Sequence, residues 1–197
     1  MMNKYGTGQD HDCYPGSNIL VNHLNIQDGV RLEQAERDIT ALTAVEINFS
    51  PPPYDLLYLQ KIHQILFQDI YPWAGSIRVI DISKGDTRFC SYNRIAPEAH
   101  KIFSGLSDQD YLFHLNREEL IVALAEIYGD LNMIHPFREG NGRALRILFE
   151  HLIAHCGWKL SWAGINKEEW IDANILSVYC DYSGLDSIFS QCIQGRI

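Results

Sequence analysis

The chain has 197 residues, of which 46% are hydrophobic, and its formal net charge is −9. This length and composition suit one globular domain with a buried core and exclude a disordered chain. The acidic balance argues against a general nucleic-acid surface, which needs a basic face, but it is compatible with a small basic pocket for an anion. We therefore expect no direct nucleic-acid partner.

Cysteine usage and the apolar runs bear on the compartment. The five cysteines are odd in number and scattered, which does not suit a disulfide framework or a zinc site, so reduced thiols are expected. The first residues carry acids, glycines and a proline where a signal peptide would need an apolar core, and no apolar stretch reaches the ~20 residues of a membrane helix. We expect a cytoplasmic protein without a membrane partner.

The start of the chain differs in pattern from the rest. Residues 1–27 hold glycines and a proline and show no long periodic run, so we expect an N-terminal extension that packs on the core. One domain is then expected over residues 28–197.

Two amphipathic helices are predicted at the beginning of that domain. Apolar residues at helical spacing, among them Val30, Leu42 and Val45, predict a long helix that begins near Asp28 and ends before a run of three prolines. The stretch YDLLYLQKIHQILFQDI predicts the second helix, and we interpret its His63 as an ordinary helix residue.

The next stretch, GSIRVIDISKGDTRF, changes from helical to strand periodicity. Ile77 and Val79 alternate, Lys84-Gly85-Asp86 supplies a turn, and residues 87–90 return as a second strand. This hairpin, called the flap below, spans about residues 77–90 and is the only hairpin that the pattern predicts.

Helical patterns resume after the flap. Further helices are expected over APEAHKIFSGL, after the capping-box pair Asn116 and Glu119, from the GNGR stretch to Gly157, after Asn166 with Glu169, and after Ser183 with Asp186. The fold class that these elements predict is mostly α, a helical bundle with a single β-hairpin.

Charge and backbone freedom are concentrated in HPFREGNGRALR, which begins at His135 between two predicted helices. Gly140, Asn141 and Gly142 allow successive backbone N–H groups to point into one concavity, and the first turn of the following helix adds unpaired donors. Such an arrangement binds phosphate. Phe137 is expected to point inward and anchor the segment.

Charged residues flank this backbone concavity. Arg143 and Arg146 lie three residues apart on the predicted helix, so both can face one side, where two guanidinium groups suit a polyphosphate. Glu139 would repel a phosphate unless a divalent cation lay between them, and Mg²⁺ is commonly held in this way. His135 is a candidate general base, because an unperturbed imidazole has a pKa of ~6.5. A plain turn explains none of these charges.

The segment from His135 to Arg146 resembles the signature of Fic-domain proteins, in which a histidine, a phenylalanine and an acid precede GNGR and a second arginine. The stretches IYPWAGSIR and KGDTRF resemble the region that leads into the family's flap. YPGSNILVNHLNI resembles the amino-terminal sequence of bacterial cell-filamentation Fic proteins. Together these stretches extend the resemblance over most of residues 14–195.

The resemblance implies a Fic-fold helical bundle and an adenylyltransferase that passes AMP from ATP to a Tyr, Thr or Ser hydroxyl of a target protein. His135 is implied to take the hydroxyl proton, and Glu139 to hold Mg²⁺ against the α and β phosphates. The amides around residues 140–142 would steady the α phosphate, and the Asn141 side chain would help to orient the phosphate or the metal. Arg143 is implied to contact the β phosphate and Arg146 the γ phosphate.

The flap is implied to bind the target segment by adding a strand to it, a recognised mode of main-chain recognition. The residues implied in this contact are Lys84, Gly85, Asp86, Thr87 and Phe89. The chain also resembles, in length and amino-terminal sequence, toxins that modify the ATPase subunits of type II topoisomerases, DNA gyrase and topoisomerase IV.

Many Fic proteins are restrained by a helix that carries serine or threonine, three variable residues, glutamate, and then glycine or asparagine. The present sequence has no such motif. We therefore expect a separate small antitoxin to supply the helix, with its glutamate paired to Arg146.

Several alternatives stay open. A phosphotransferase branch of the family has lysine at the position of Gly142, so glycine favours AMP transfer, but transfer from another nucleotide and a non-catalytic nucleotide- or partner-binding module are compatible with these residues. His151 and His155 have a metal-binding spacing without an evident third ligand. Trp170 is interpreted as a core anchor, and Asn174, on the late helix, could approach the adenine, although its spacing does not show this.

Overall fold

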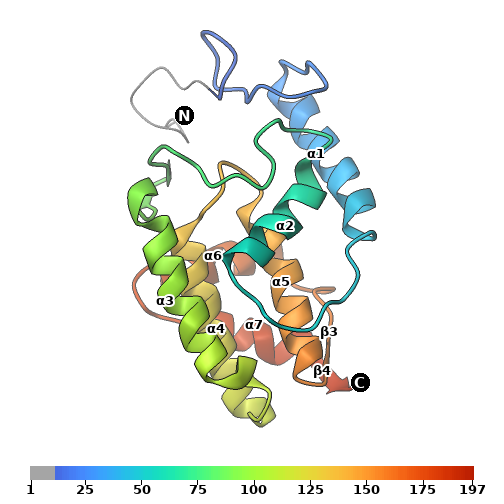
Figure 1. Cartoon of the computed structure of the whole chain (residues 1–197), viewed down its shortest axis with the longest axis vertical. Helices are drawn as coiled ribbons and strands as arrows, with labels where there is room; N and C mark the ends of the chain where they lie inside the picture. Colours follow the sequence, from blue (N-terminus) through green and yellow to red (C-terminus); the bar gives the residue numbers. More distant parts are fainter. Residues whose placement is uncertain (1–11) are drawn as a thin grey trace.

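The computed structural model describes residues 12–197, and it is built mainly of helices (Figure 1). Its α-helices are α1 (Gly29–Ala44), α2 (Leu56–Phe67), α3 (Ile95–Asp108), α4 (Arg117–Ile134), α5 (Asn141–His155), α6 (Lys167–Ser177) and α7 (Ser183–Cys192). Two short 3₁₀ segments, Tyr92–Arg94 and Asp110–Leu112, flank α3. The mostly helical fold class expected from the sequence is confirmed.

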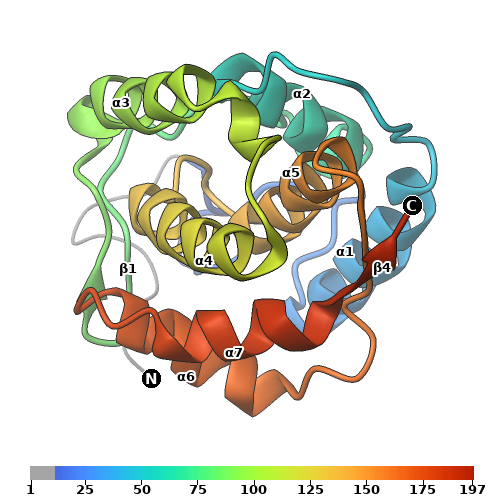
Figure 2. The same ribbon diagram turned by 90° about the horizontal axis from the view of Figure 1, so that it is seen from below.

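Helices α4 and α5 form the centre of the bundle. In the view along the bundle, α2 and α3 lie on one side of this pair and α6 and α7 on the other, and α1 packs against α2 at the edge of the bundle (Figure 2). The start of α4 is fixed by a capping box, as predicted, because the Asn116 side chain accepts from the Glu119 backbone and the Glu119 side chain accepts from the Asn116 backbone. The segment that joins α4 to α5 is therefore held between two anchored helices.

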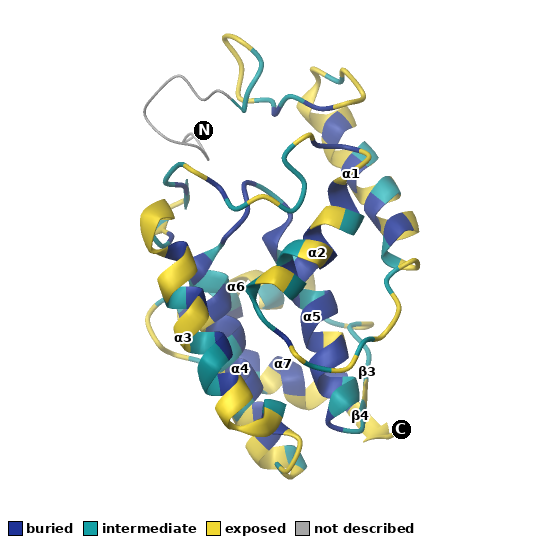
Figure 3. Cartoon of the chain, in the orientation of Figure 1, coloured by how far each residue is buried: buried dark blue, intermediate teal, exposed yellow. Residues whose placement is uncertain are grey.

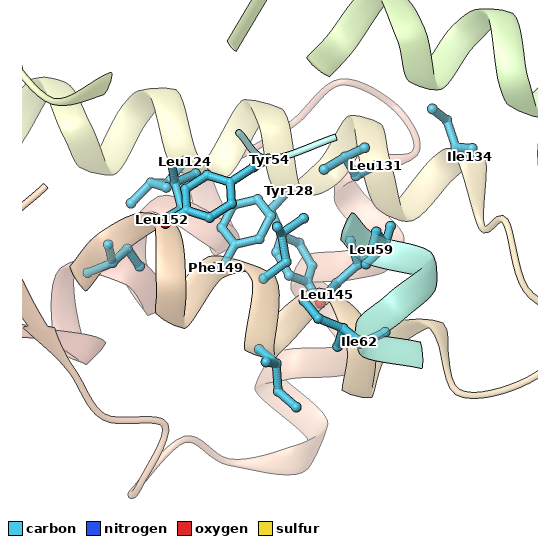
Figure 4. Close-up of a cluster of buried hydrophobic side chains, with 14 of the residues drawn as sticks. Tyr54, Leu59, Ile62, Leu124, Tyr128, Leu131, Ile134, Leu145, Phe149 and Leu152 are labelled. Atoms are coloured by element: carbon cyan, nitrogen blue, oxygen red, sulfur yellow. The ribbon is translucent and has the colours of Figure 1, made fainter. Parts of the chain in front are cut away.

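The core lies along the shared face of α2, α4 and α5. Tyr54, Leu59, Ile62, Leu124, Tyr128, Leu145, Phe149 and Leu152 gather there (Figure 4). Figure 3 shows the corresponding dark stripes on the inward faces of these helices. Truncation of one such aliphatic side chain to alanine typically costs about 2–5 kcal/mol, so this cluster fixes the mutual position of the three helices.

Helix α1 does not bury the face that its apolar residues predict. Val30, Leu42 and Val45 are 79%, 70% and 81% exposed, and the helix ends at Ala44, well before the prolines. The buried positions are Leu32, Glu36, Thr40 and Thr43. The face is set by polar contacts, since the Thr43 hydroxyl donates to the Leu66 carbonyl at 3.1 Å, and Glu36 faces α5.

The flap is shorter than predicted as a β structure. Its paired strands are only β1 (Ser83–Lys84) and β2 (Thr87–Arg88), and Val79 lies in an exposed irregular segment. A second antiparallel pair, which the pattern did not reveal, joins β3 (Trp158–Leu160) to β4 (Ile193–Arg196). Because its partners lie far apart in the sequence, no local turn signal announces it.

The expected N-terminal extension is described only in part, since residues 1–11 lie outside the described range. The described part contacts the core: Leu20 is buried, and the backbone N–H of His23 donates to the Ile70 carbonyl at 2.8 Å. All five cysteines are free. Within residues 12–197, none of the helices combines the length and the apolar character that crossing a bilayer requires.

Candidate active site

One cavity of about 350 Å³ lies where the α4–α5 loop, the flap and α6 meet. From the loop it is lined by His135, Arg138, Glu139, Asn141 and Gly142. From the flap it is lined by Ile82, Ser83, Lys84, Gly85, Thr87 and Phe89. The structure thus brings the candidate base, the candidate metal ligand, the start of α5 and most of the flap residues to one cavity. Asp86 is not among the lining residues.

The loop leaves α4 through a left-handed residue. His135 is the C-cap of α4, with φ 48° and its backbone N–H donating to the Leu131 carbonyl at 3.2 Å. Phe137 then turns inward and is fully buried, as predicted. The Asn141 side chain closes the loop, because its Oδ1 accepts from the Phe137 N–H and its Nδ2 donates to the Phe137 carbonyl, both at 2.8 Å. The Asn141 amide is thus occupied by the loop itself.

The hydrogen bonds of His135 define its tautomer. Its Nδ1 lies 3.0 Å from the Asn132 carbonyl, which can only accept, so Nδ1 carries the proton and Nε2 the lone pair. One face of the ring stacks on Phe89 of the flap, with centroids 3.8 Å apart. Burial lowers the pKa of His135 from 6.5 to about 4; the Asn132 carbonyl and Glu139 oppose the shift, whereas Arg78 and Lys84 reinforce it. At neutral pH the ring is therefore a neutral base.

The start of α5 presents backbone donors. Gly140 is its N-cap at φ 79°, a left-handed conformation that favours glycine, and a Cβ built there would lie 2.2 Å from Cζ of Phe67. The Gly140 N–H donates to Glu139 Oε1 at 3.0 Å. The first N–H groups of a helix have no intrahelical acceptor, so those of Asn141 and Gly142 are available to an anion.

Arg143 and Arg146 were predicted to face one side of the helix, but they point in different directions. Arg143 turns toward α1, where its Nη2 pairs with Glu36 and its Nη1 donates to the Thr40 hydroxyl at 3.4 Å. Its guanidinium carbon lies 4.7 Å from the Phe67 ring centroid, and its Nη2 is 3.9 Å from Glu139 Oε1. Arg143 lines a second cavity behind the loop, whereas the first cavity has neither arginine among its lining residues.

Arg146 lies nearer the first cavity. Its guanidinium carbon is 5.7 Å from the ring centroid of Trp170, a residue that lines the cavity, and its Nε donates to the Gly142 carbonyl at 3.3 Å. The difference between the two arginines follows from their neighbours, because Glu36 draws Arg143 to the far side of α5.

His63 was interpreted from the sequence as an ordinary helix residue, but it supports the loop from behind. It is completely buried and stacks on Phe137, with centroids 3.9 Å apart. Its Nδ1 accepts from the Gly75 N–H and its Nε2 donates to the Glu139 carbonyl, both at 2.9 Å. Burial lowers the pKa of His63 to about 4, so the neutral ring fits both bonds. Only the helical spacing of His63 with other buried α2 residues hinted at its burial.

The wall opposite the loop comes from α4 and α6, and only two of its residues were named from the sequence. It consists of Tyr128, Asn132, Trp170, Ile171, Asn174, Ile175 and Val178. Trp170 is therefore part of the cavity as well as of the packing, and Asn174 also lines the cavity. This apolar wall with few polar groups is typical of a small-molecule site.

The donor chemistry fits magnesium only together with a phosphate ligand. Mg²⁺ in proteins is commonly held by one or two carboxylates plus substrate phosphates and waters, and Glu139 supplies one carboxylate at the cavity. Within residues 12–197, no group of three or more histidine, cysteine, aspartate or glutamate side chains is arranged to hold a metal. His151 and His155 therefore have no third ligand of these types beside them.

Comparison with known proteins identifies the class. The model of the Fic/DOC family matches residues 53–153. The chain is 42% identical over 193 residues, covering 98% of it and 96% of the relative, to the "Probable protein adenylyltransferase Fic" of Escherichia coli (strain K12). It is 34% identical over 180 residues, 90% of this chain and 38% of the relative, to the "Protein adenylyltransferase VbhT" of Bartonella schoenbuchensis. The chain belongs to the Fic/DOC family.

Solved structures agree with this assignment. The BepC protein of Bartonella tribocorum, with bound AMPPNP, superimposes with a TM-score of 0.89 at 25% identity and covers 94% of this chain and 97% of that one. The Fic domain of a cell filamentation protein from Bartonella quintana, with bound ADP, has a TM-score of 0.86 at 28% identity, over 94% and 95% of the two chains. The resemblance expected from the sequence is confirmed, and the bundle is a Fic fold.

Proposed function

We propose that this chain is a protein adenylyltransferase that transfers AMP from ATP to a side-chain hydroxyl of a target protein. The observation that supports this proposal is the cavity shared by His135, Glu139, the start of α5 and the flap. Relatives named as protein adenylyltransferases and neighbours with bound AMPPNP and ADP favour the same nucleotide chemistry.

In the proposed reaction the target hydroxyl oxygen forms a bond to the α phosphorus, and the bond from that phosphorus to the β-bridging oxygen breaks. Pyrophosphate leaves, and the hydroxyl proton passes to Nε2 of His135. The Nδ1 proton fixes this tautomer, and the low pKa keeps Nε2 unprotonated at neutral pH. A positioned base and preorganised charge suffice for much of the catalysis of such transfers.

The phosphates are proposed to lie over the start of α5. The N–H groups of Asn141 and Gly142 would donate to the α phosphate, and Glu139 would hold Mg²⁺, which neutralises charge on the α and β phosphates when bound. Gly140, which has no side chain, allows the phosphates to approach the backbone. Arg146 would contact the γ phosphate. Arg143 would have to leave Glu36 to reach the β phosphate.

The target is proposed to bind the flap, with the edge of β1 or β2 adding a strand of the target segment. The cavity-lining flap residues Lys84, Gly85, Thr87 and Phe89 would then lie closest to the acceptor, and Asp86 at the turn would contact the segment outside the cavity. The ATPase subunits of DNA gyrase and topoisomerase IV are the proposed targets, and purified subunits are the first acceptors to test.

A toxin–antitoxin role in the cytoplasm is the finer part of the proposal. It rests on the absence of an inhibitory motif from the sequence, and a small antitoxin is proposed to place a glutamate against Arg146. Co-purification of the chain with the product of a neighbouring reading frame tests it, and loss of that co-purification in an Arg146→Gln variant would locate the contact.

Two labels distinguish AMP transfer from its alternatives. With purified protein, cell extract and ATP, label on the α phosphorus is expected on a protein band, whereas label on the γ phosphorus is not. His135→Ala is expected to reduce α labelling by ~10²-fold or more, because a positioned base contributes about that much, while it leaves ATP binding unchanged. The matched control is His114→Ala, since His114 is exposed and distant from the cavity.

The same experiment can reject the proposal. Transfer of γ label would indicate a phosphotransferase, and transfer from UTP or another nucleotide would change the substrate. ATP binding without any labelled protein, in extract and with purified topoisomerase subunits alike, would favour a non-catalytic nucleotide-binding module.

A further inference from the structure

One buried arginine joins the flap to the loop that carries His135. Arg78 lies at the start of the flap and is only 5% exposed. Its Nε donates to the His135 carbonyl at 2.8 Å, and its Nη1 donates to the Ile80 carbonyl at 2.7 Å. Its Nη2 donates to the carbonyls of Cys90 and Ile134, the latter at 3.2 Å.

The acceptors belong to three different segments. Ile134 and His135 form the end of α4, where helix carbonyls lack intrahelical partners and a cation is favoured by the helix dipole. Ile80 precedes the β1–β2 hairpin and Cys90 follows it, so the guanidinium bridges both ends of the hairpin. Its planar fork allows one side chain to satisfy several carbonyls in fixed directions.

The main chain of Arg78 strengthens the same junction. Its N–H donates to the Pro136 carbonyl at 2.9 Å, directly after His135. On the other side, the Cys90 N–H donates to the Met133 carbonyl at 3.0 Å. The flap therefore enters and leaves along the end of α4, and Arg78 occupies the point where the two passages meet.

These bonds determine where two aromatic rings meet. Arg78 holds His135 by donating to the His135 carbonyl, and it holds Phe89 by donating to the carbonyl of the next residue, Cys90. The two rings stack with an interplanar angle of 13°. A displacement of either segment would separate them, and it would also change the direction in which Nε2 of His135 faces the cavity.

We propose that Arg78 is a positioning residue that holds the flap against the catalytic loop, and so sets the orientation of His135, through main-chain carbonyls alone. Only the expected effect of the His135 orientation on activity rests on the proposed adenylyltransferase function. The attachment of the flap is a property of the protein without substrate and can be measured separately.

Arg117 provides a matched control. Its Nη2 also donates to main-chain carbonyls, those of Ser190 at 2.7 Å and Ile193 at 2.9 Å, but it joins α4 to α7 at the opposite end of the bundle. Arg78→Met and Arg117→Met therefore both remove guanidinium–carbonyl bonds, four at Arg78 and two at Arg117, and only the first touches the flap.

Trypsin cleavage after Lys84 and Arg88 reports the attachment of the flap. Arg78→Met is expected to increase the cleavage rate there about tenfold or more, because hydrogen bonds from a charged donor are lost and local opening becomes easier. Arg117→Met should change this rate by less than about twofold, since the flap keeps its bonds. The His135 ring signals in ¹H–¹³C spectra should shift with Arg78→Met and stay in place with Arg117→Met.

Activity supplies the second readout. With α-labelled ATP and cell extract, Arg78→Met is expected to lower kcat about 10²-fold with KM for ATP changed little, because a misplaced base costs rate more than binding. If the wild-type protein labels no acceptor, the adenylyltransferase proposal fails, but the cleavage and spectroscopic results still decide the role of Arg78.

A more conservative variant guards against misfolding. Arg78→Lys keeps the charge with one compact ammonium, which cannot bridge all four carbonyls, so it should fold and give an intermediate cleavage rate. If both Arg78 variants fold and match Arg117→Met in cleavage and in the His135 signals, the proposal is wrong. If Arg78→Met and Arg117→Met lower stability equally and the flap opens only with global unfolding, Arg78 is merely structural.

Discussion

The two segments that enclose the cavity are held in opposite ways. The catalytic loop, residues 135–146, is supported from behind by His63, by Phe67 under Gly140, and by the closure that Asn141 makes with Phe137. The flap is tied at its base by Arg78, while its turn at Gly85 has open space around it. The part proposed for chemistry is thus rigid, and the part proposed for target recognition is anchored only at its ends.

Glycine substitutions provide the strongest test of this difference. Gly140 and Gly85 both have positive φ, 79° and 58°, so alanine is strained at both. At Gly140 the added Cβ would also meet the Phe67 ring, and we expect Gly140→Ala to lower the free energy of unfolding by about 2–5 kcal/mol. Gly85→Ala should lower it by only about 1–2 kcal/mol. Urea denaturation of both variants measures the difference, and equal losses would contradict it.

The support by His63 is the next largest effect. His63→Gln places an amide near the position of Nε2 and keeps a donor for the Glu139 carbonyl, whereas His63→Asn keeps an acceptor near Nδ1 for the Gly75 N–H. Each variant leaves one buried backbone group unpaired, at a cost of about 1–3 kcal/mol.

Activity should separate these two variants. We expect His63→Gln to retain clearly more AMP transfer than His63→Asn at similar thermal stability, because only the first preserves the bond to the catalytic loop. If the two lose activity in proportion to stability alone, His63 does not position Glu139.

The two arginines should differ in how much each contributes to stability. Arg143→Gln leaves the mostly buried Glu36 without its ion-pair partner and is expected to cost about 1–3 kcal/mol of unfolding free energy. Arg146→Gln should cost less than about 1 kcal/mol but weaken ATP binding about tenfold, since a charged donor to phosphate is lost. Denaturation and calorimetric ATP titration measure the pair, and the reverse ranking would contradict this assignment.

The contact between flap and loop should also appear in the pH dependence. The proposed base is the neutral ring of His135, whose pKa is lowered to about 4, so AMP transfer should remain nearly constant as the pH falls from 8 to 5.5. Phe89→Ala exposes the ring and raises its pKa toward 6.5, so activity should decline as the pH falls below about 6.5. Phe113→Ala, an exposed aromatic away from the cavity, is the control.

The sequence allowed the arrangement of residues 135–146 to be predicted better than that of its surroundings. The candidate base, the candidate metal ligand and the glycines lie within twelve residues, so their proximity is a local property. The support by His63 and the direction of Arg143 depend on where α2 and α1 pass behind α5. No local sequence pattern predicts this position, because it is set by contacts between distant segments. For the same reason, the buried face of α1 was predicted only in part, because its polar residues contact α2 and α5 and Ile39 packs against the core, while Val30 and Leu42 remain exposed.

The brevity of the β1–β2 hairpin has a consequence for how the protein could change its choice of substrate. Only the ends of this segment are tied to the bundle, and a Cβ added to the glycine of its turn would meet no neighbouring atom. On the proposed function, a different short sequence at the turn would change the target that is recognised, while the contacts of Arg78 and the stacking of Phe89 on His135 keep the base of the flap in place. Retargeting in the laboratory would therefore begin at this turn.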